Sequence, residues 1–153
     1  MNTAVKGGCE ISTDKSRLNI ALIHQYLSTE SYWAKNIPFE LVQKSIDGSF
    51  CFGLYTNEQQ IGFARVITDF ATFGYLADVF IVPEYRGKGL SKLLMENIMS
   101  HPQLQNFRRW MLATRDAHSL YRQFGFVPLP HPERLMQQLA LNAYPPLAQD
   151  KNK

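Results

Sequence analysis

Apolar residues follow two different spacings along the chain, and the spacing changes several times. In residues 18–27 and 90–98 they recur at every third or fourth position, which is the spacing of one face of a helix. Segments 50–56 and 61–68 are instead rich in aromatic and β-branched residues, a composition that favours strands. Because only the polar residues 57–60 separate these two segments, the pattern predicts an antiparallel hairpin.

Shorter runs predict the remaining elements. Further strands are expected at 9–12, 78–82, 108–113 and from 126–127 onward. Further helices are expected at 39–46, after Pro38, and at 114–123, before a capping Gly125. Residues 70–74 should form a connection, and residues 133–141 fit either a last strand or a short helix. The two ends, residues 1–8 and 144–153, are expected to be loose.

This order of elements, β-α-α-β-β-β-α-β-α-β with an undecided end, indicates an α/β fold with a mixed sheet and helices on both faces. The 153 residues contain 45% hydrophobic residues. A chain of this length buries roughly two-thirds of its unfolded surface on folding. We therefore expect one domain over residues 1–153.

Composition narrows the possible partners and location. The net charge is +3, and only Arg108 and Arg109 are adjacent basic residues, so a nucleic-acid partner is not expected. No stretch has the length and apolarity of a membrane span, and no secretory leader is evident, which argues against a membrane partner. The two cysteines, Cys9 and Cys51, lie far apart, which favours a reduced, cytoplasmic protein. The His, Cys, Asp and Glu residues of the sequence do not show the spacing of a metal site.

A glycine turn follows the predicted strand 78–82. Pro83 ends the strand, Gly87 and Gly89 allow a tight turn, and the helix 90–98 begins directly afterwards. The first N–H groups of a helix lack partners within the helix and lie at its positive end, so they suit an anion such as a phosphate. Nearby positive charges add to this attraction, at Arg86, Lys88 and Lys92.

The spacing of this turn excludes two familiar phosphate loops. No Walker motif is present, and Lys92 stands where a dinucleotide fingerprint needs its third glycine. The run Arg86-x-x-Gly89-x-Ser91, preceded by V-x-P-E-Y, resembles the pyrophosphate loop of the GNAT family of N-acetyltransferases. Ser91 departs from the Gly or Ala of that pattern. An ordinary strand-to-helix turn is the alternative for the loop considered alone.

A second motif strengthens the resemblance. Residues 117–126, AHSLYRQFGF, are similar to the A-x-x-L-Y-x-x-x-G-F segment of the same family, and they fall on a predicted helix. The two motifs together cover about residues 78–127, and the element order extends the resemblance over most of the chain. The resemblance implies a GNAT-like acyl-CoA N-acyltransferase fold, with a mostly antiparallel sheet that splays between its two parallel middle strands.

The resemblance also implies a binding mode for acetyl-CoA as cosubstrate. The backbone of Phe80, Ile81 and Val82 would pair with the pantetheine amides. Thr114 or Asp116 would stand where the family often has an asparagine. The pyrophosphate would rest on the backbone amides of the loop, from Arg86, Gly87 and Lys88 to Gly89, Leu90 and Ser91, with Arg86 and Lys88 as charge partners.

The implied chemistry is direct acyl transfer to an amine, without a metal. Tyr121 is the expected catalytic proton donor, because a phenol (pKa near 10) keeps its proton until a thiolate (thiol pKa near 8.5) begins to leave; a packed aromatic is the alternative. A backbone N–H near Phe80 would stabilise the oxyanion. Asp78, or else Asp69, could act as base through water, although each could also be a satisfied strand-end carboxylate. His118 is a weaker catalytic candidate.

The acceptor is expected to be an amine, on a small molecule or a peptide, that the sequence does not identify. By the family's topology, Tyr32, Trp33, Phe70 and Phe73 would border its site, although loop aromatics serve equally often in contacts of a homodimer. A non-catalytic module that binds acyl-CoA as a sensor is the alternative function, and an intact Tyr121 argues against it.

Overall fold

The computed structural model describes residues 4–146, which form one six-stranded mixed sheet. The strand order follows the chain, β1-β2-β3-β4-β5-β6, and only β5 and β6 run parallel to each other. The strands are β1 (Ala4–Lys6), β2 (Cys9–Ser12), β3 (Phe50–Thr56), β4 (Gln59–Thr68), β5 (Phe73–Ile81) and β6 (Arg109–Leu112).

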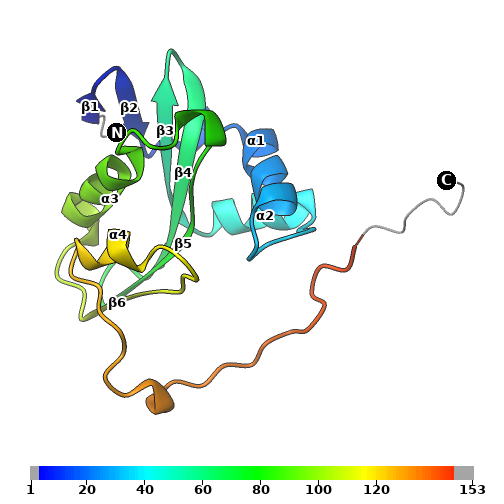
Figure 1. Cartoon of the computed structure of the whole chain (residues 1–153), viewed down its shortest axis with the longest axis vertical. Coiled ribbons are helices and arrows are strands. Elements are labelled where there is room, and N and C mark those ends of the chain that lie inside the picture. Colours follow the sequence, from blue (N-terminus) through cyan, green and yellow to red (C-terminus); the bar gives the residue numbers. More distant parts are fainter. Residues whose placement is uncertain (1–3, 147–153) are drawn as a thin grey trace, which may run out of the picture.

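Helices cover both faces of this sheet, as Figure 1 shows: α3 and α4 lie on one side and α1 and α2 on the other. Their bounds are α1 (Ile20–Gln25), α2 (Phe39–Asp47), α3 (Leu90–Ser100) and α4 (His118–Arg122). A π-helical turn, Tyr26–Glu30, continues α1, and 3-10 turns lie at Lys15–Arg17, Pro83–Tyr85, Pro102–Leu104 and Pro132–Arg134. The expected mixed α/β fold is confirmed.

The core fills both spaces between sheet and helices. From the sheet it receives Phe52, Leu54, Ile61 and Phe63, all at most 1% exposed. Helix α3 buries its apolar face, with Leu94, Met95 and Ile98 fully enclosed, and α2 buries Val42 and Ile46. Leu94 and Ile98 belong to the apolar spacing seen in the sequence, so the pattern located the buried face of α3.

The beginning of the chain is more ordered than the sequence indicated. Residues 1–8 were expected to be loose, but residues 4–6 form β1 and pair with β2, while residues 1–3 lie outside the described part. The turn between the two strands consists of Gly7 and Gly8, with φ of 59° and 78°. Two consecutive residues at positive φ make a turn whose twist matches a hairpin, and we had overlooked this signal.

Several predicted boundaries were wrong. The β3–β4 hairpin turns on Asn57 and Glu58 alone, at φ of 48° and 65°, so β4 starts two residues earlier than expected. Strand β5 starts at Phe73, five residues early, because residues 73–77 pair with both β4 and β6. Helix α4 is shorter than the predicted 114–123, since the residues before it form a turn.

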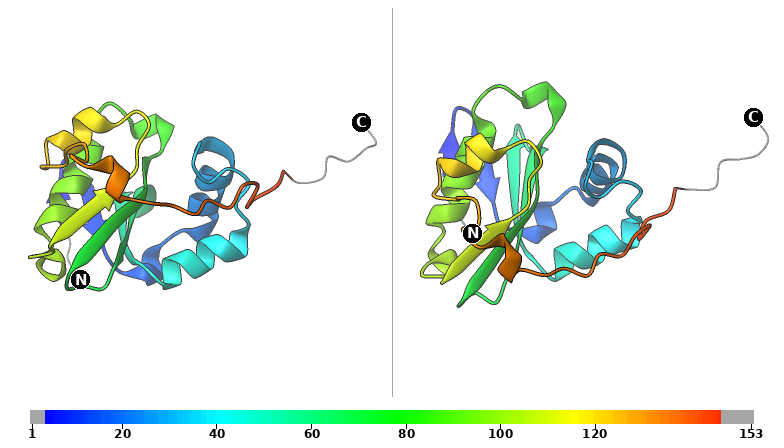
Figure 2. Two further views of the ribbon diagram at one scale, coloured as in Figure 1. Left: turned by 90° about the horizontal axis from the view of Figure 1, so that it is seen from below. Right: turned by 60° about the horizontal axis from the view of Figure 1, so that its bottom comes forward.

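The end of the chain leaves the domain. Neither the strand expected from 126–127 nor a strand or helix over 133–141 forms; beyond the turn Pro132–Arg134, residues 135–140 have no regular structure and residues 141–144 form a turn. Figures 1 and 2 show this C-terminal tail, residues 127–146, running from the β6 side of the molecule past α2. Residues 147–153, part of the segment expected to be loose, lie outside the described part.

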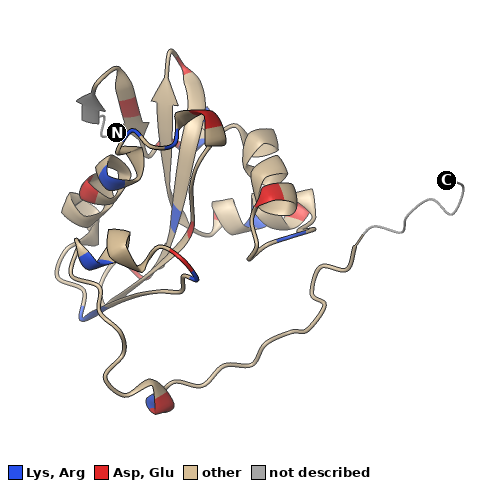
Figure 3. Cartoon of the chain, in the orientation of Figure 1, with Lys and Arg blue, Asp and Glu red and all other residues tan. Residues whose placement is uncertain are grey.

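Basic residues do not form a continuous stripe on the described part of the chain. Figure 3 shows Lys and Arg distributed over several elements and interspersed with acidic residues. Within residues 4–146 no helix is both long and apolar enough to cross a bilayer. The two cysteines are buried and unpaired, and burial raises the pKa of the Cys51 thiol to about 11.

Candidate functional site

Strands β5 and β6 separate halfway along β5, as the resemblance implied. They pair in register from Phe73 and Arg109 to Leu76 and Leu112, after which β5 continues alone to Ile81. The register against β4 shifts at the same level, and Asp78 adopts a left-handed φ of 54°. Such a bulge bends a strand and redirects its side chains, so the two parallel strands diverge here and leave a cleft.

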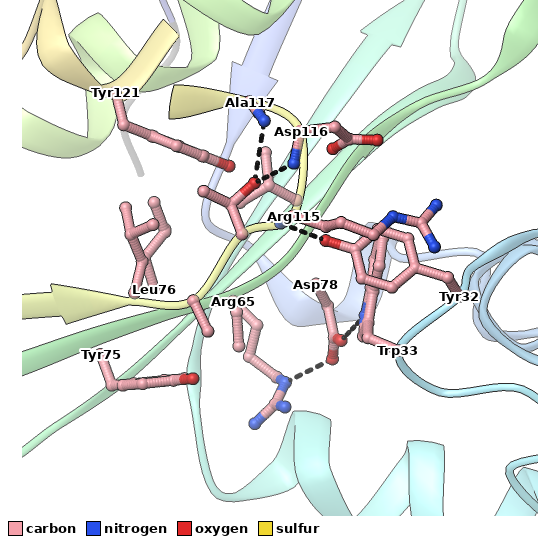
Figure 4. A pocket seen from close by; sticks show the side chains of 15 residues that line it. Tyr32, Trp33, Arg65, Tyr75, Leu76, Asp78, Arg115, Asp116, Ala117 and Tyr121 are labelled. Carbon is pink, nitrogen blue, oxygen red and sulfur yellow. Dashed lines mark hydrogen bonds and ion pairs between the residues drawn. The ribbon is translucent and has the colours of Figure 1, made fainter. Parts of the chain in front are cut away.

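A cavity of about 510 Å³ occupies the mouth of this cleft. Its lining comes from β4, β5, the end of β6, the segment between β6 and α4, α4 itself, and the loop that carries Tyr32 and Trp33 (Figure 4). Segments from distant parts of the sequence therefore meet where the sheet opens, an arrangement typical of a binding site.

A buried ion pair forms one wall of the cavity. Arg65 on β4 donates from Nε to Asp78 Oδ2 at 2.9 Å, and the two side chains are only 15% and 9% exposed. Trp33 Nε1 donates to the other oxygen, Asp78 Oδ1, at 2.8 Å, and Arg65 also reaches Ser49. Since both carboxylate oxygens of Asp78 already accept a bond, this side chain holds Trp33 and Arg65 in place.

We expect Asp78→Asn to lower the free energy of unfolding by about 2 kcal/mol, because the partly buried guanidinium of Arg65 would then face a neutral amide. Urea denaturation measures this loss. Glu10→Gln is the matched control, since the Glu10–Arg17 pair is about one-third exposed on both sides and should contribute much less. Equal losses in the two variants would show that burial of the Asp78–Arg65 pair does not increase its contribution to the free energy of unfolding.

The loop residue Tyr32 closes the opposite side of the cavity. Its hydroxyl accepts a bond from the backbone N–H of Arg115 at 2.9 Å, and the Arg115 guanidinium lies over its ring, 3.9 Å from the centroid. Trp33 packs edge-to-face against the same ring at 5.0 Å. The two aromatic residues expected beside the acceptor site therefore do line the cavity.

Tyr121 reaches the cavity from α4. Its side chain is 9% exposed, its ring packs against Phe126, and the residue lines the cavity. Burial raises the pKa of this phenol to about 12, with smaller effects from Tyr32 and Asp116. Tyr121 therefore presents a protonated hydroxyl to the cleft at neutral pH.

The glycine turn lies at the other end of the cleft. Gly87 and Gly89 have φ of 78° and 75°, and a Cβ on either would meet no atom within 4 Å. Their role is therefore conformational, and the surface above them is open for a ligand. A cavity of about 240 Å³ adjoins this turn and is bounded by Ile81 of β5, Ser91 of α3 and Leu120 of α4.

Arg86 is oriented differently from the expected phosphate partner. Its Nε donates to the carbonyl of Ile81 at 3.1 Å, and its Nη2 donates to the Tyr26 hydroxyl at 2.7 Å. The backbone N–H of Val82 bonds to Ile61 of β4. Because adjacent residues of a strand point their backbone groups to opposite edges, Ile81 faces the cleft, whereas the N–H of Val82 is already paired within the sheet.

Other candidates lie elsewhere or already have partners. The Thr114 hydroxyl accepts from the N–H groups of Asp116 and Ala117 and so shapes the start of α4. Asp69 accepts from Thr72 and three backbone N–H groups in the β4–β5 turn, which lowers its pKa. His118 is exposed and borders a neighbouring cavity that Tyr121 also lines.

Two aromatic residues were wrongly placed at the acceptor site. Phe70 packs edge-to-face against Phe50 at 5.4 Å, and Phe73 starts β5, so neither lines the cavity. The error follows from the late start that we predicted for β5, which assigned both residues to one loop.

Three site residues were missed from the sequence. Arg65 had a usable signal, because a charged residue inside the apolar strand 61–68 needs a partner. No sequence motif marked Arg115, which lies between Thr114 and Asp116. Tyr26, whose ring stacks on Phe80 at 3.9 Å, looked like one more apolar position of a helix face.

Comparisons with known proteins agree with this architecture. Residues 47–128 match the acetyltransferase (GNAT) domain. A protein of Gibberella zeae named as an acetyltransferase is 33% identical over 139 residues, 76% of this chain and 77% of its own. A crystal structure of a Xanthomonas campestris pv. campestris protein, assigned to GNAT acetyltransferases, is 51% identical, with a TM-score of 0.87 over 90% of this chain and 97% of its own.

A more distant structure shares the fold alone. It is a Clostridium acetobutylicum acetyltransferase with acetyl-CoA, 17% identical, with a TM-score of 0.61 over 88% of this chain and 96% of its own. The splayed sheet, the glycine turn and these matches define an acetyltransferase domain. The chain belongs to the GNAT family of acetyltransferases.

Proposed function

We propose that this protein transfers the acetyl group of acetyl-CoA directly to a primary amine. The observation that carries the proposal is the course of the cleft. It runs from the open glycine turn, past the free edge of β5 at Ile81, to Tyr121, which lines the cavity at the mouth of the cleft. A long cosubstrate with a phosphate at one end and a reactive thioester at the other fits such a course.

Each part of the cleft suits one part of acetyl-CoA. The amides of residues 86–91 would hold the pyrophosphate at the N-terminus of α3. The cleft-facing edge of β5, at Ile81, would pair with the pantetheine amides, once Arg86 has released the Ile81 carbonyl and turned toward the phosphates. Acetyl-CoA in the Clostridium structure of the same fold supports this choice of cosubstrate.

The transfer needs an amine in its neutral form, stabilisation of the oxyanion and a proton for the thiolate. The amine nitrogen would attack the thioester carbonyl, the C–S bond would break, and Tyr121 would give its proton to the leaving sulfur. The nitrogen would release one proton to water as the amide forms, and water would return a proton to Tyr121. A backbone N–H at the bulge of β5 would stabilise the oxyanion. Asp78 would chiefly position Trp33 and Arg65. Its second possible role is that of a base that acts through a water molecule.

The acceptor would enter through the cavity between Tyr32, Trp33 and Asp78. Flat aromatic walls favour an amine that also has an apolar or planar portion. Reduced, buried cysteines agree with a cytoplasmic setting for the reaction. Screening a panel of primary amines for thiol release from acetyl-CoA tests the proposal. Binding of acetyl-CoA without thiol release from any amine would instead support a non-catalytic sensor.

Ligand binding should also appear as thermal stabilisation. At a concentration 100 times its Kd, acetyl-CoA is expected to raise the Tm by roughly 5–10 °C, because it binds the native state only. NAD and ATP at the same concentration should raise it much less, since the turn has neither nucleotide fingerprint. Differential scanning fluorimetry measures all three, and equal shifts would refute the assignment of the cosubstrate.

A further inference from the structure

Part of the C-terminal tail is apolar but unburied. Met136 is 97% exposed, Leu139 67% and Leu141 80%. Residues 135–141 contain no charge and no proline, and within the described chain no backbone hydrogen bond holds positions 136–141. Uncharged apolar segments with free backbone groups are ready to pair with another strand, so this segment is expected to be covered in the working protein.

The segment has the pattern of a strand. Leu135, Leu139 and Leu141 fall on one side of an extended chain, and Met136 and Gln138 fall on the other. The backbone of Leu135 is already extended, with φ of −101° and ψ of 137°. Such a segment can add to the edge of a sheet through its backbone while its side chains fill pockets.

An open sheet edge of this kind exists in the same molecule. Strand β6 is the last in the strand order and pairs only with β5, so its outer edge has no partner strand among the described residues. A cavity of about 330 Å³ lies beside it, bounded by Trp110 and Leu112 of β6, by Leu129 and by Tyr121. The edge and its mainly apolar surroundings match the tail segment in chemistry.

Segment 135–141 does not pair with this edge within the described chain, although Val127, Pro128 and Leu129 border the cavity beside it. Pro128 and Pro130 favour extended backbone at the residues before them, whereas Pro132 begins a 3-10 turn. The chain then runs toward α2 (Figure 2), where Tyr144 and Leu41 line the same cavity. The segment 135–141 therefore spans solvent between two attached ends.

We propose that the protein is a two-fold symmetric homodimer in which segment 135–141 of each copy pairs with the outer edge of β6 in the other. One contact of this kind generates the second by symmetry, so both exposed segments and both open edges are covered together. Residues 1–127 are only 83% of the chain, so the alignment with the Xanthomonas structure over 90% of the chain includes part of the tail. At least the beginning of the tail therefore has a counterpart in the Xanthomonas chain.

The exchange would also complete the cleft. The cavity beside β6 is lined by Tyr121 and Thr114, so the partner's strand would form its outer wall. This consequence rests on the proposed function: thiol release should fall when the dimer is lost. The oligomeric state itself can be measured without any activity.

Analytical ultracentrifugation of the full chain tests whether the protein forms the dimer in which the two copies exchange segment 135–141. The mass should be twice the 17.6 kDa of one chain. Leu139→Asp combined with Leu141→Asp should reduce it to the monomer, because two carboxylates would enter the apolar interface. Gln138→Asp combined with Asn142→Asp adds the same charge on the opposite side of the strand and should remain dimeric. A monomeric wild type, or a dimer that survives L139D/L141D, would overturn the proposal.

Cross-linking identifies the contact. One tagged chain carries Leu139→Cys, and a differently tagged chain carries Met111→Cys on β6; after mixing, a bis-maleimide should join the two tags. The native cysteines are buried and should not react. If a single chain with both substitutions links only within itself, at the monomer mass, the segment pairs with its own β6 and the exchange is excluded.

Discussion

Replacing Tyr121 by Phe is expected to lower kcat on the order of 10²-fold or more, with little change in the Kd for acetyl-CoA. The phenyl ring would keep its packing against Phe126, and the substitution removes only the hydroxyl. The fold should survive, so the loss of rate would report the missing proton. Steady-state kinetics together with calorimetric Kd measurements separate the two effects.

The pH dependence gives an independent check on Tyr121. Because burial raises its pKa to about 12, the phenol stays protonated as pH rises through 10, where an exposed tyrosine would lose its proton. The proton donor should therefore remain active over pH 7–10 and be lost only as pH approaches 12. A fall in kcat centred near pH 10 would mean that Tyr121 is not buried as described or does not donate.

Two controls distinguish a proton donor from a structural tyrosine. Tyr55→Phe removes another buried phenol whose pKa burial raises to about 12, but on β3 and away from the cleft, so kcat should not change. An activated thioester, whose thiolate needs no proton, should recover much of the rate of Tyr121→Phe. If the mutant is impaired equally with both thioesters, Tyr121 only packs, and water or His118 becomes the next candidate.

Gly89→Val is expected to weaken acetyl-CoA binding by on the order of 10²-fold or more, through the loss of two or more charge-assisted bonds of about 1.5 kcal/mol each. Gly89 has a φ of 75° and is the N-cap of α3. A β-branched residue disfavours this conformation, and its branches would occupy the space above the turn that the phosphate needs. Isothermal calorimetry with acetyl-CoA measures the change.

Gly8→Val is the matched control for this substitution. Gly8 has nearly the same φ, 78°, and the same open surroundings, but it lies in the β1–β2 turn. Both variants should therefore lose similar stability, and only Gly89→Val should lose the ligand. Unchanged binding in Gly89→Val would mean that the phosphate lies elsewhere.

The parts of this structure that the sequence predicted are those with local signals. Helix α3 follows from its apolar spacing, helix α2 follows from the proline before it, and the turn at Gly87 and Gly89 follows from the backbone freedom of glycine. The meeting of Tyr121 with the separated strands depended on two motifs and a family topology. Composition and periodicity alone would not have brought them together.

The parts that the sequence did not predict depend on tertiary contacts. The carboxylate of Asp78 was considered as a base, but whether it is free depends on Arg65 and Trp33, which join it from other elements. Arg86 was assigned to the phosphate, yet the position of its side chain depends on Tyr26, sixty residues earlier. Residues 133–141 are apolar enough to pack as a strand or as a helix, and no local signal states which partner they pack against.

The strand order of the sheet bears on how the protein folds. Strands β3, β4 and β5 are joined by short turns, so their pairing is local and can form early. The β1–β2 hairpin and β6 are separated from them by the helices α1 and α2 and by α3, and their pairing closes longer loops. Trp33 lies in the first of these long connections, Tyr121 follows the second, and Asp78 belongs to the early meander. The cleft is therefore assembled only when all three parts have come together, so a partly folded chain that contains just the meander lacks the cleft in which the proposed transfer would take place.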